Sequence, residues 1–359
     1  MGKKILKYAG RVLVVVTSVI LVLALTLMGA IYMISKGKAE SVKEMFVVAM
    51  CETGAMDFCA RMFLSNEEVD AIIEKTQIIV PEGETNTSLI VISGEDSEDS
   101  PTIKEQETAD SKLGIKYNDD GVCLLDIKGK TYVGKVLVVK DPKRVQLAAL
   151  DSYGENVVGK TTEQMAKDLN ALAAINAGGY EERSDYRTGG QPAGCDGESG
   201  LVIDNGVLKY GSKDATYNII GFDGNGILHV DKMTAGKALE SGILDAVNWT
   251  PALVKNGEPC IVNTASTNPG FHPRSAIGQR ADGSVVLLVI DGRQAHSMGA
   301  SYEDLVEVMM RYGCVNAANL DGGMSSYMVY DNEVITKPYM LYFNGRRTVS
   351  TSFIVTRKN

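Results

Sequence analysis

The sequence has few of the features that mark a helical bundle or a nucleic-acid-binding protein. It holds a single tryptophan among 359 residues, whereas glycine occurs 37 times, a composition that favours a turn-rich, sheet-containing fold. Basic residues are not in excess either, because 36 lysines and arginines oppose 45 aspartates and glutamates and leave a net charge of −9. A nucleic-acid-binding surface needs a basic face, so this balance argues against nucleic acid as a partner.

The cysteines lack the spacing of a zinc site. None of the six stands in a Cys-x-x-Cys pair, so structural zinc is not expected. Cys51 and Cys59 fall in a segment that we expect to be helical, where eight residues span about 12 Å and put a disulfide between them out of reach. We therefore expect mostly free, buried thiols, although Cys195 lies in a loop rich in glycine and polar residues.

Residues 12–34 form a run of 23 residues without a charge. Such a run is long enough to cross a bilayer with some tilt. The expected cytoplasmic tail, residues 1–11, carries three lysines and one arginine. Because positive flanks stay on the cytoplasmic side, we expect a single-pass protein of the cell membrane whose main domain is extracytoplasmic. A cleaved signal peptide is the alternative, but its apolar region is shorter, and the run has no clear small-x-small cleavage site.

Residues 35–80 are expected to form a membrane-proximal helical stalk. Apolar residues recur at helical spacing through residues 39–64, and the Ser-Asn-Glu-Glu run at residues 65–68 is typical of a capping box that opens a second helix. The methionine-rich stripe of the first helix suits packing, with a protein-binding groove as the other interpretation. Residues 81–112 are acidic and polar, which is typical of a solvated linker, and the apolar island at residues 88–93 is a candidate strand.

The globular domain is expected over residues 113–359. Capping boxes at Thr161 and Ser301 predict two helix starts, and residues 234–247 are helix-prone. Short apolar runs between glycine- and asparagine-containing turns predict strands throughout. Because strands and helices do not alternate regularly, the predicted fold class is α+β with a mixed, mostly antiparallel sheet and a few helices. The predicted strands cover residues 122–127, 131–139, 145–150, 173–180, 201–203, 207–209, 217–222, 227–230, 275–279, 285–290, 314–320, 327–330, 333–336 and 351–356, with a hairpin at 251–258.

Two of the apolar runs end in Asp-Gly, at Asp291 and at Asp321. Glycine supplies the positive φ that a turn needs, so each aspartate leaves a strand at a point where a rigid scaffold presents side chains to a ligand. Arg274 and Arg293 flank the first of these turns in the sequence. Residues 322 and 323 are glycines, so no side chain covers their backbone amides. Two carboxylates, two arginines and bare amides suit an anionic substrate. The plain alternative is that Asp-Gly is a common hairpin turn.

Five motifs in this domain together resemble those of the phosphodiester glycosidase family. They are Ile-Asn-Ala-Gly-Gly-Tyr (175–180), Pro-Arg-Ser-Ala-Ile-Gly (273–278), Ile-Asp-Gly-Arg (290–293), Val-Asn-Ala-Ala-Asn-Leu-Asp-Gly-Gly (315–323) and a closing strand (346–355). The resemblance covers residues 113–357 and includes the order of the motifs. Two positions depart from the family pattern. Met324 replaces the third glycine of that pattern, and Tyr327 replaces its threonine. A side chain at position 324 narrows the expected pocket or requires a different backbone angle.

The resemblance implies hydrolysis of a sugar-1-phosphodiester to free sugar and a phosphomonoester, on glycans of the cell envelope or an exopolysaccharide. Such a reaction needs carboxylates near the glycosidic bond and cations for the phosphate. Asp291 and Asp321 are the expected acid/base or charge-stabilising pair, with the assignment between them open, and Arg274 is the expected phosphate clamp. The expected substrate-binding residues are Asn176, Gly178, Gly179, Arg293, Gly322, Gly323, Ser325, Ser326 and Arg347.

Several alternatives stay open. Arg274 is otherwise an ion-pair partner of one of the aspartates, and Asn176 an asparagine that satisfies loop backbone. His272 and His296 are further acid/base candidates. Oxygen donors around the aspartates suit a hard divalent cation such as calcium, although no spacing identifies a metal or cofactor site. The alternative functions are a non-catalytic carbohydrate- or envelope-binding protein, favoured by the residues at 324 and 327, and a metal-dependent phosphodiesterase that cleaves the P–O bond.

Overall fold

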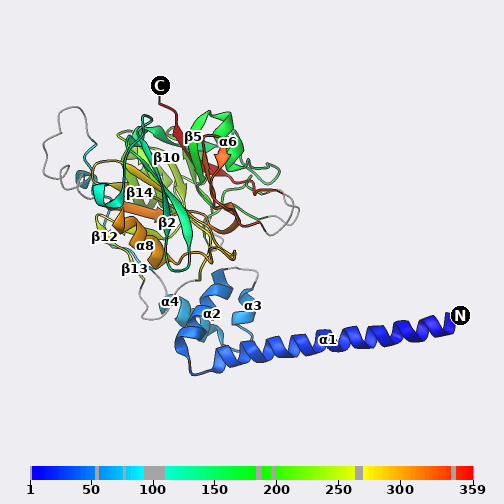
Figure 1. Ribbon diagram of the computed structural model, residues 1–359. Helices are drawn as coiled ribbons and strands as arrows, with labels where there is room; N and C mark the ends of the chain where they lie inside the picture. The colour runs from blue at the N-terminus through cyan, green and yellow to red at the C-terminus, as the bar shows by residue number, and fades with distance from the viewer. Residues whose placement is uncertain are drawn as a thin grey trace. The chain divides into compact units, whose positions relative to one another are not determined.

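A computed structural model describes residues 2–52, 56–75, 78–81, 83–92, 110–182, 188–195, 199–262, 270–340 and 345–358. The chain divides into two compact units (Figure 1). The helical unit is Met1–Gln77 with Asn263–Gly270, and the sheet unit is Ile78–Val262 with Phe271–Asn359. Each unit is described by itself.

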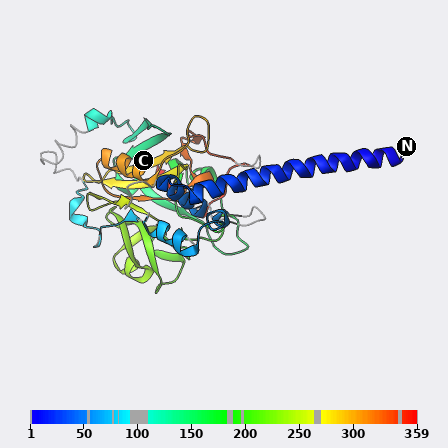
Figure 2. The same ribbon diagram turned by 90° about the horizontal axis from the view of Figure 1, so that it is seen from below.

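The helical unit begins with α1 (Gly2–Lys36), which is one continuous helix (Figure 2). From Gly10 to Lys36 it is long and apolar enough to cross a membrane, with a mean hydropathy of 2.8 and no burial of its most apolar stretch. The leucines, isoleucines and valines of this helix between residues 12 and 27 are exposed. A helix of this kind fits a membrane anchor or a signal sequence.

Three shorter helices follow, α2 (Glu40–Glu52), α3 (Asp57–Ala60) and α4 (Asn66–Lys75). Their shared core contains Val47, Val48, Ala60, Leu64, Val69 and Ile72. The predicted capping box at residues 65–68 is confirmed, because the Ser65 amide donates to Glu68 at 2.9 Å and the Glu68 amide donates to Ser65 Oγ at 3.2 Å. The single helix predicted over residues 39–64 is wrong, since α2 ends at Glu52. A glycine at position 54, a poor helix former, follows that end.

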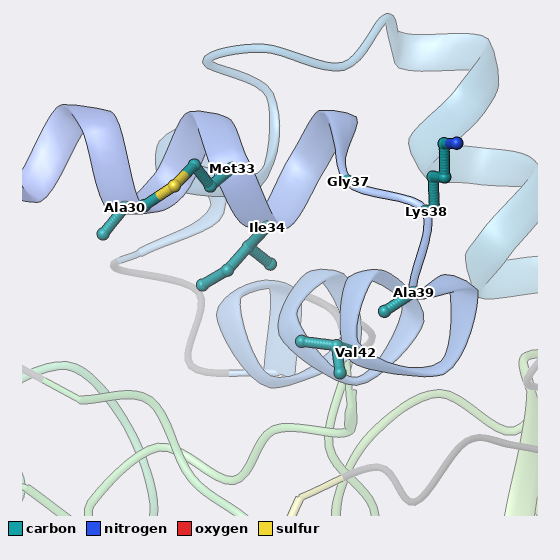
Figure 3. Close-up of a pocket in the computed structure, with 7 residues that line it drawn as sticks. All are labelled: Ala30, Met33, Ile34, Gly37, Lys38, Ala39 and Val42. Atoms are coloured by element: carbon teal, nitrogen blue, oxygen red, sulfur yellow. The ribbon is translucent and has the colours of Figure 1, made fainter.

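The turn between α1 and α2 encloses an apolar recess of about 260 Å³ (Figure 3). The residues that line it are Ala30, Met33, Ile34, Gly37, Lys38, Ala39 and Val42. The recess continues the apolar surface of α1, so it belongs to the same exposed apolar region of the helical unit.

The sheet unit is built from three antiparallel sheets and one short strand pair (Figure 1). The large sheet has the order β12 (Glu258–Pro259), β11 (Ala252–Lys255), β16 (Cys314–Asn319), β14 (Arg274–Arg280), β15 (Val285–Ile290), β3 (Val133–Val139), β2 (Val122–Lys128). The β5 sheet has the order β18 (Glu333–Val334), β17 (Met328–Tyr330), β5 (Ala171–Asn176), β19 (Thr351–Thr356), β4 (Val145–Ala149). The β10 sheet has the order β7 (Val207–Tyr210), β6 (Val202–Asp204), β10 (Ile243–Asn248), β8 (Thr216–Asp223), β9 (Leu228–Thr234). The short pair is β1 (Ile78–Ile79) with β13 (Ile261–Val262).

All three sheets contribute one face to a common core. Leu137, Ile277 and Val289 come from the large sheet, Ile175 and Phe353 from the β5 sheet, and all are fully buried. One helix covers the other face of each sheet. Helix α8 (Tyr302–Arg311) lies on the large sheet, α6 (Thr162–Asp168) on the β5 sheet and α7 (Ala235–Glu240) on the β10 sheet. When both faces of a sheet are covered, side chains at the ends of its strands can be buried.

The predicted α+β class is confirmed, and every described ladder is antiparallel. The capping boxes at Thr161 and Ser301 are also confirmed. The helix predicted over residues 234–247 is wrong beyond Glu240, because Gly242 adopts a φ of 81° and the chain then enters β10. The apolar island at residues 88–93 is not a strand in its described part, which starts with a 3-10 turn at Thr87–Leu89.

Part of the expected linker lies against the sheet unit. The Thr85 amide donates to Asp231 Oδ1 at 2.8 Å, and the Val91 amide donates to the Ala281 carbonyl at 2.8 Å. Asp231 also pairs with the buried Lys255 at 2.9 Å. Residues 83–92 are therefore fixed on this unit, whereas residues 93–109 lie outside the described residues.

The six cysteines are free thiols, as predicted. Four of them are buried, namely Cys59, Cys123, Cys260 and Cys314. Burial raises the pKa of Cys260 to about 11 and that of Cys314 to about 12, so these thiols stay protonated at neutral pH.

Candidate active site

The two candidate aspartates follow strands of the large sheet that are separated by one strand. Asp291 follows β15 and Asp321 lies two residues beyond β16, while Arg274 opens β14 between them. The registers pair Arg274 with Ile290 and Ala276 with Asn319. Because adjacent strands lie about 4.8 Å apart, the two carboxylate-bearing segments are about 10 Å apart at their backbones.

Asn176, at the end of β5, bridges the β5 sheet to this end of the large sheet. Its Nδ2 donates to the Asp321 carbonyl at 2.6 Å, and Ser275 Oγ donates to its Oδ1 at 2.6 Å. The Asp321 amide in turn donates to the Ala177 carbonyl at 3.0 Å. Asn176 is fully buried, and both polar groups of its amide hold protein partners. The expected contact of Asn176 with a sugar hydroxyl stays a prediction, and this geometry favours a positioning role.

Asp321 is partly exposed and is bonded to the backbone of its own loop. The Gly322 amide donates to its Oδ1 at 2.9 Å. Burial raises the pKa of Asp321 from 3.8 to about 6, although hydrogen bonds from Ser325 and from the Gly322 amide lower it. A carboxyl with that pKa keeps its proton in about half of the molecules at pH 6 and in about a tenth at pH 7, far more than an ordinary aspartate, which suits a proton donor.

A polar cluster of Ser325, Tyr180 and Arg347 contacts the Asp321 loop. Ser325 Oγ lies 2.8 Å from Tyr180 Oη. Burial raises the pKa of Tyr180 far above its ordinary range, and the neighbouring Asp321 charge adds to this shift, so Tyr180 stays protonated. Arg347 forms an ion pair with Glu182 and a hydrogen bond with Tyr180. Arg347 therefore places a positive charge next to the group that holds Asp321.

Asp291 is held in a different way. Its buried carboxylate accepts a hydrogen bond from the Lys337 amide at 2.9 Å, and His296 Nε2 lies 3.0 Å from its second oxygen. Ser297 Oγ donates to its carbonyl. The two carboxylate oxygens are therefore held in orientation by two different groups. His296 also lines a recess of about 160 Å³ that includes the exposed Lys128 and Lys130.

The two arginines of the sequence motifs have separate environments. Arg274 is buried, donates from Nε to the Ala300 carbonyl at 3.3 Å, and stacks its guanidinium 4.0 Å above the Tyr302 ring at the start of α8. This environment favours packing beneath α8, and the role of Arg274 as phosphate clamp stays a prediction. Arg293 is exposed, bonds His272 Nδ1 at 3.0 Å, and lies next to Gly323. Arg293 is thus the cation nearer to the Asp321 loop.

The glycines of the motifs are explained by close packing and by backbone angle. A Cβ atom at Gly179 would lie 2.0 Å from Cζ3 of Trp249, and one at Gly178 would lie 3.0 Å from Val247. Gly323 adopts a φ of 65° and its amide donates to the Pro273 carbonyl at 2.9 Å. The amides of residues 322 and 323 therefore already have protein acceptors, and their expected bonds to substrate stay a prediction.

The two departures from the family pattern lie in different surroundings. Tyr327 is fully buried under α6, where its hydroxyl accepts a hydrogen bond from the Thr162 amide at 2.9 Å. Its ring is therefore a core element. Met324 lies on the 3-10 turn Gly323–Ser325 and is partly exposed, unlike Tyr327. The neighbouring Ser326 hydroxyl is buried with no hydrogen-bond partner among the described residues.

No group of three histidine, cysteine, aspartate or glutamate side chains in the described part of the chain is arranged to hold a metal ion. The contacts of Asp291 and Asp321 are instead with amides, a hydroxyl and a histidine. The cation considered from the sequence therefore gains no support from this arrangement.

Sequence reasoning did not assign roles to Tyr180, Glu182, Trp249 or Lys337. Tyr180 ends the Asn-Ala-Gly-Gly-Tyr motif, which was the one available signal. Lys337 contributes a backbone amide 46 residues away from Asp291, and no side-chain pattern reports that contact.

The Asn176 bridge leads to a prediction for stability. Asn176→Ala leaves the Ser275 hydroxyl and the Asp321 carbonyl without their buried partner, so we expect a loss of about 2–3 kcal/mol in the free energy of unfolding. Denaturant unfolding of the full-length protein in detergent measures it. Asn225→Ala, at an exposed turn, is the matched control and should be neutral. Equal midpoints for the two variants would show that the bridge does not hold the sheets together.

The raised pKa of Asp321 leads to a second prediction. Between pH 4 and pH 6 the unfolded chain has released this proton while the folded protein keeps it, so stability falls as pH rises through that window. Asp321→Asn lacks this loss. Relative to wild type, the variant should therefore gain about 2 kcal/mol of stability from pH 4 to pH 7, less than the full shift would give because the side chain is partly exposed. Thermal unfolding at both pH values tests this, and a pH-independent difference between the proteins contradicts it.

Comparisons with known proteins agree with this arrangement. A model of the phosphodiester glycosidase family matches residues 169–356, which is more than half of the chain. The SPbeta prophage-derived protein YomE of Bacillus subtilis (strain 168) is 28% identical over 244 residues, a match that covers 65% of this chain and 36% of that protein. The chain thus spans little more than a third of the length of that relative.

A solved structure of similar fold is the zebrafish N-acetylglucosamine-1-phosphodiester alpha-N-acetylglucosaminidase catalytic domain, auto-inhibited by its pro-peptide. It matches with a TM-score of 0.54 and 20% identity, over 75% of this chain and 87% of that one. At this identity the likeness shows the shared fold. The family match itself spans β5, β14, β15 and β16, whose ends carry the two aspartates and their supports. The chain belongs to the phosphodiester glycosidase family.

Proposed function

We propose that this protein hydrolyses the glycosidic C–O bond of a sugar-1-phosphodiester and releases free sugar and a phosphomonoester. The observation that carries the proposal is the pair of aspartates at the ends of β15 and β16, one strand apart in the large sheet and held in unlike environments. Asp321 has a pKa raised to about 6, whereas Asp291 accepts from the Lys337 amide and lies against His296. Two carboxyl groups with divided roles are what glycoside hydrolysis requires.

In this mechanism Asp321 donates its proton to the bridging oxygen as the bond to the sugar breaks. Ser325 and the Gly322 amide hold the carboxyl in place and stabilise the carboxylate that forms. Asp291 either orients the attacking water or stabilises the positive charge that develops on the sugar ring. Its fixed orientation means that it needs no reorganisation during the reaction.

The phosphate of the substrate is negatively charged and needs cations near the leaving oxygen. Arg293 reaches the Gly323 backbone, and Arg347 lies beside Tyr180 behind the Asp321 loop. Planar guanidinium groups bind phosphate oxygens in pairs, so these two arginines are the proposed phosphate contacts. The recess next to His296, with Lys128 and Lys130 at its rim, offers further positive charge for an anionic aglycone.

The cellular setting is part of the proposal. Helix α1 serves as an uncleaved membrane anchor, and its basic flank at residues 1–11 keeps the N-terminus in the cytoplasm. The sheet unit then faces the outside of the cell. Substrates within its reach are the phosphodiester-linked sugars of envelope glycans or exopolysaccharides.

The test uses full-length protein in detergent and a panel of sugar-1-phosphodiesters in heavy-oxygen water, with and without a chelator. We expect release of free sugar that carries the label, since water attacks the sugar carbon. Asp321→Asn and Asp291→Asn should each lower kcat by about 10²- to 10⁴-fold. Asp126→Asn, at an exposed surface position, is the matched control and should keep the wild-type rate.

Three other outcomes would contradict the proposed reaction or the assigned roles. Wild-type rates in both active-site variants would contradict the assigned roles. Label in the phosphate would indicate cleavage of the P–O bond by a phosphodiesterase. A folded protein that binds the panel and releases no sugar would favour the non-catalytic carbohydrate-binding alternative.

A further inference from the structure

The single tryptophan of the chain borders the Asp321 loop. The Trp249 ring packs against Gly179 so closely that no side chain fits there. Gly179 lies between two contacts with the loop, because the Ala177 carbonyl accepts from the Asp321 amide at 3.0 Å and Tyr180 Oη lies 2.8 Å from Ser325 Oγ. A residue packed on Gly179 is therefore beside the loop that carries the proposed acid.

The same strand end positions Trp249 and Asp321. Asn319, two residues before Asp321, donates from Nδ2 to the Thr250 carbonyl at 2.9 Å. Its amide donates to the Pro251 carbonyl at 2.9 Å. The Trp249 amide is itself fixed, since it donates to the Asn218 carbonyl at 3.2 Å. The indole and the carboxyl are thus held in a set relation by β16.

The indole of Trp249 is only partly buried by the protein. One side of Trp249 packs against the common core, yet the residue stays partly exposed. Its Nε1–H donates to no described residue, whereas tryptophan N–H groups usually find a partner when buried. The indole is therefore partly exposed next to the site, and its Nε1–H has no acceptor among the described residues.

We propose that Trp249 is the platform on which the sugar ring of the substrate stacks. The C–H groups on one face of a pyranose carry partial positive charge and fit the negative face of an indole, while a ring hydroxyl accepts from Nε1–H. A phosphate has no such apolar face, so stacking on Trp249 orients the substrate with its sugar at Trp249 and its phosphate toward Arg293. This inference rests on the proposed function and adds the sugar half of the site.

The first test uses the fact that Trp249 is the only tryptophan of the chain. Indole emission of the full-length protein in detergent is titrated with glucose, galactose, mannose and N-acetylglucosamine, and separately with inorganic phosphate. We expect a saturable change with at least one pyranose and none with phosphate. No change with any of the four sugars overturns the proposal.

The second test separates stacking from packing. Trp249→Leu keeps apolar bulk and should raise KM for the sugar-1-phosphodiester roughly three- to tenfold with little change in kcat, whereas Trp249→Phe should raise it less. Tyr330→Leu is the matched control and should keep the wild-type KM, because Tyr330 is another partly exposed aromatic on the same core but is paired with Ala173, within β5. An unchanged KM in Trp249→Leu overturns the proposal.

The two proposals fail in different ways. Emission changes with a pyranose but no hydrolysis would contradict the proposed reaction and leave the platform standing. Hydrolysis with a silent indole and an unchanged KM in Trp249→Leu would contradict the platform and leave the reaction standing.

Discussion

The site depends on one buried amide. Asn176 ties the end of β5 to Ser275 on β14 and to the backbone of Asp321 beyond β16. The apolar core that joins the β5 sheet to the large sheet is non-directional and cannot by itself set the position of a carboxyl. With the Asn176 bridge, the Asp321 loop is held against Ala177 and Tyr180. A buried amide with both groups satisfied is the kind of contact that specifies one arrangement.

The bridge also explains how two aspartates acquire different properties. Asp321 lies in a loop whose backbone is held from the β5 side, and burial raises the pKa of its carboxyl to about 6. Asp291 lies two strands away and accepts from Lys337, with His296 beside it. Environment alone divides the roles, because the residues are chemically identical. The motifs of the phosphodiester glycosidase family thus mark backbone positions as much as side chains.

Much of the sheet unit follows from local signals. Apolar runs between glycine turns located the strands that carry Asp291 and Asp321, and three capping boxes located helix starts, because both signals act within a few residues. Residues 243–248 were missed because alanine and leucine nearby favour helix, whereas burial in the β10 sheet makes them a strand. Local propensity yields there to tertiary packing.

The site was predictable only in part, for a physical reason. The carboxylates stand beside turns that the sequence displays. Their supports come from distant segments, as Lys337 does for Asp291 and Trp249 does for Gly179. Arg274 illustrates the limit, because its motif suggested a phosphate contact and its buried position on Tyr302 depends on where α8 lies. Long-range pairing of this kind is not written in residue spacing.

The central claim is that Asp321 acts as the proton donor, and the pH dependence of sugar release tests it most directly. With full-length protein in detergent, kcat/KM should be highest on the acid side and fall about tenfold per pH unit above about 6, as Asp321 loses its proton. A rate that stays level or rises from pH 6 to pH 8 would contradict the account.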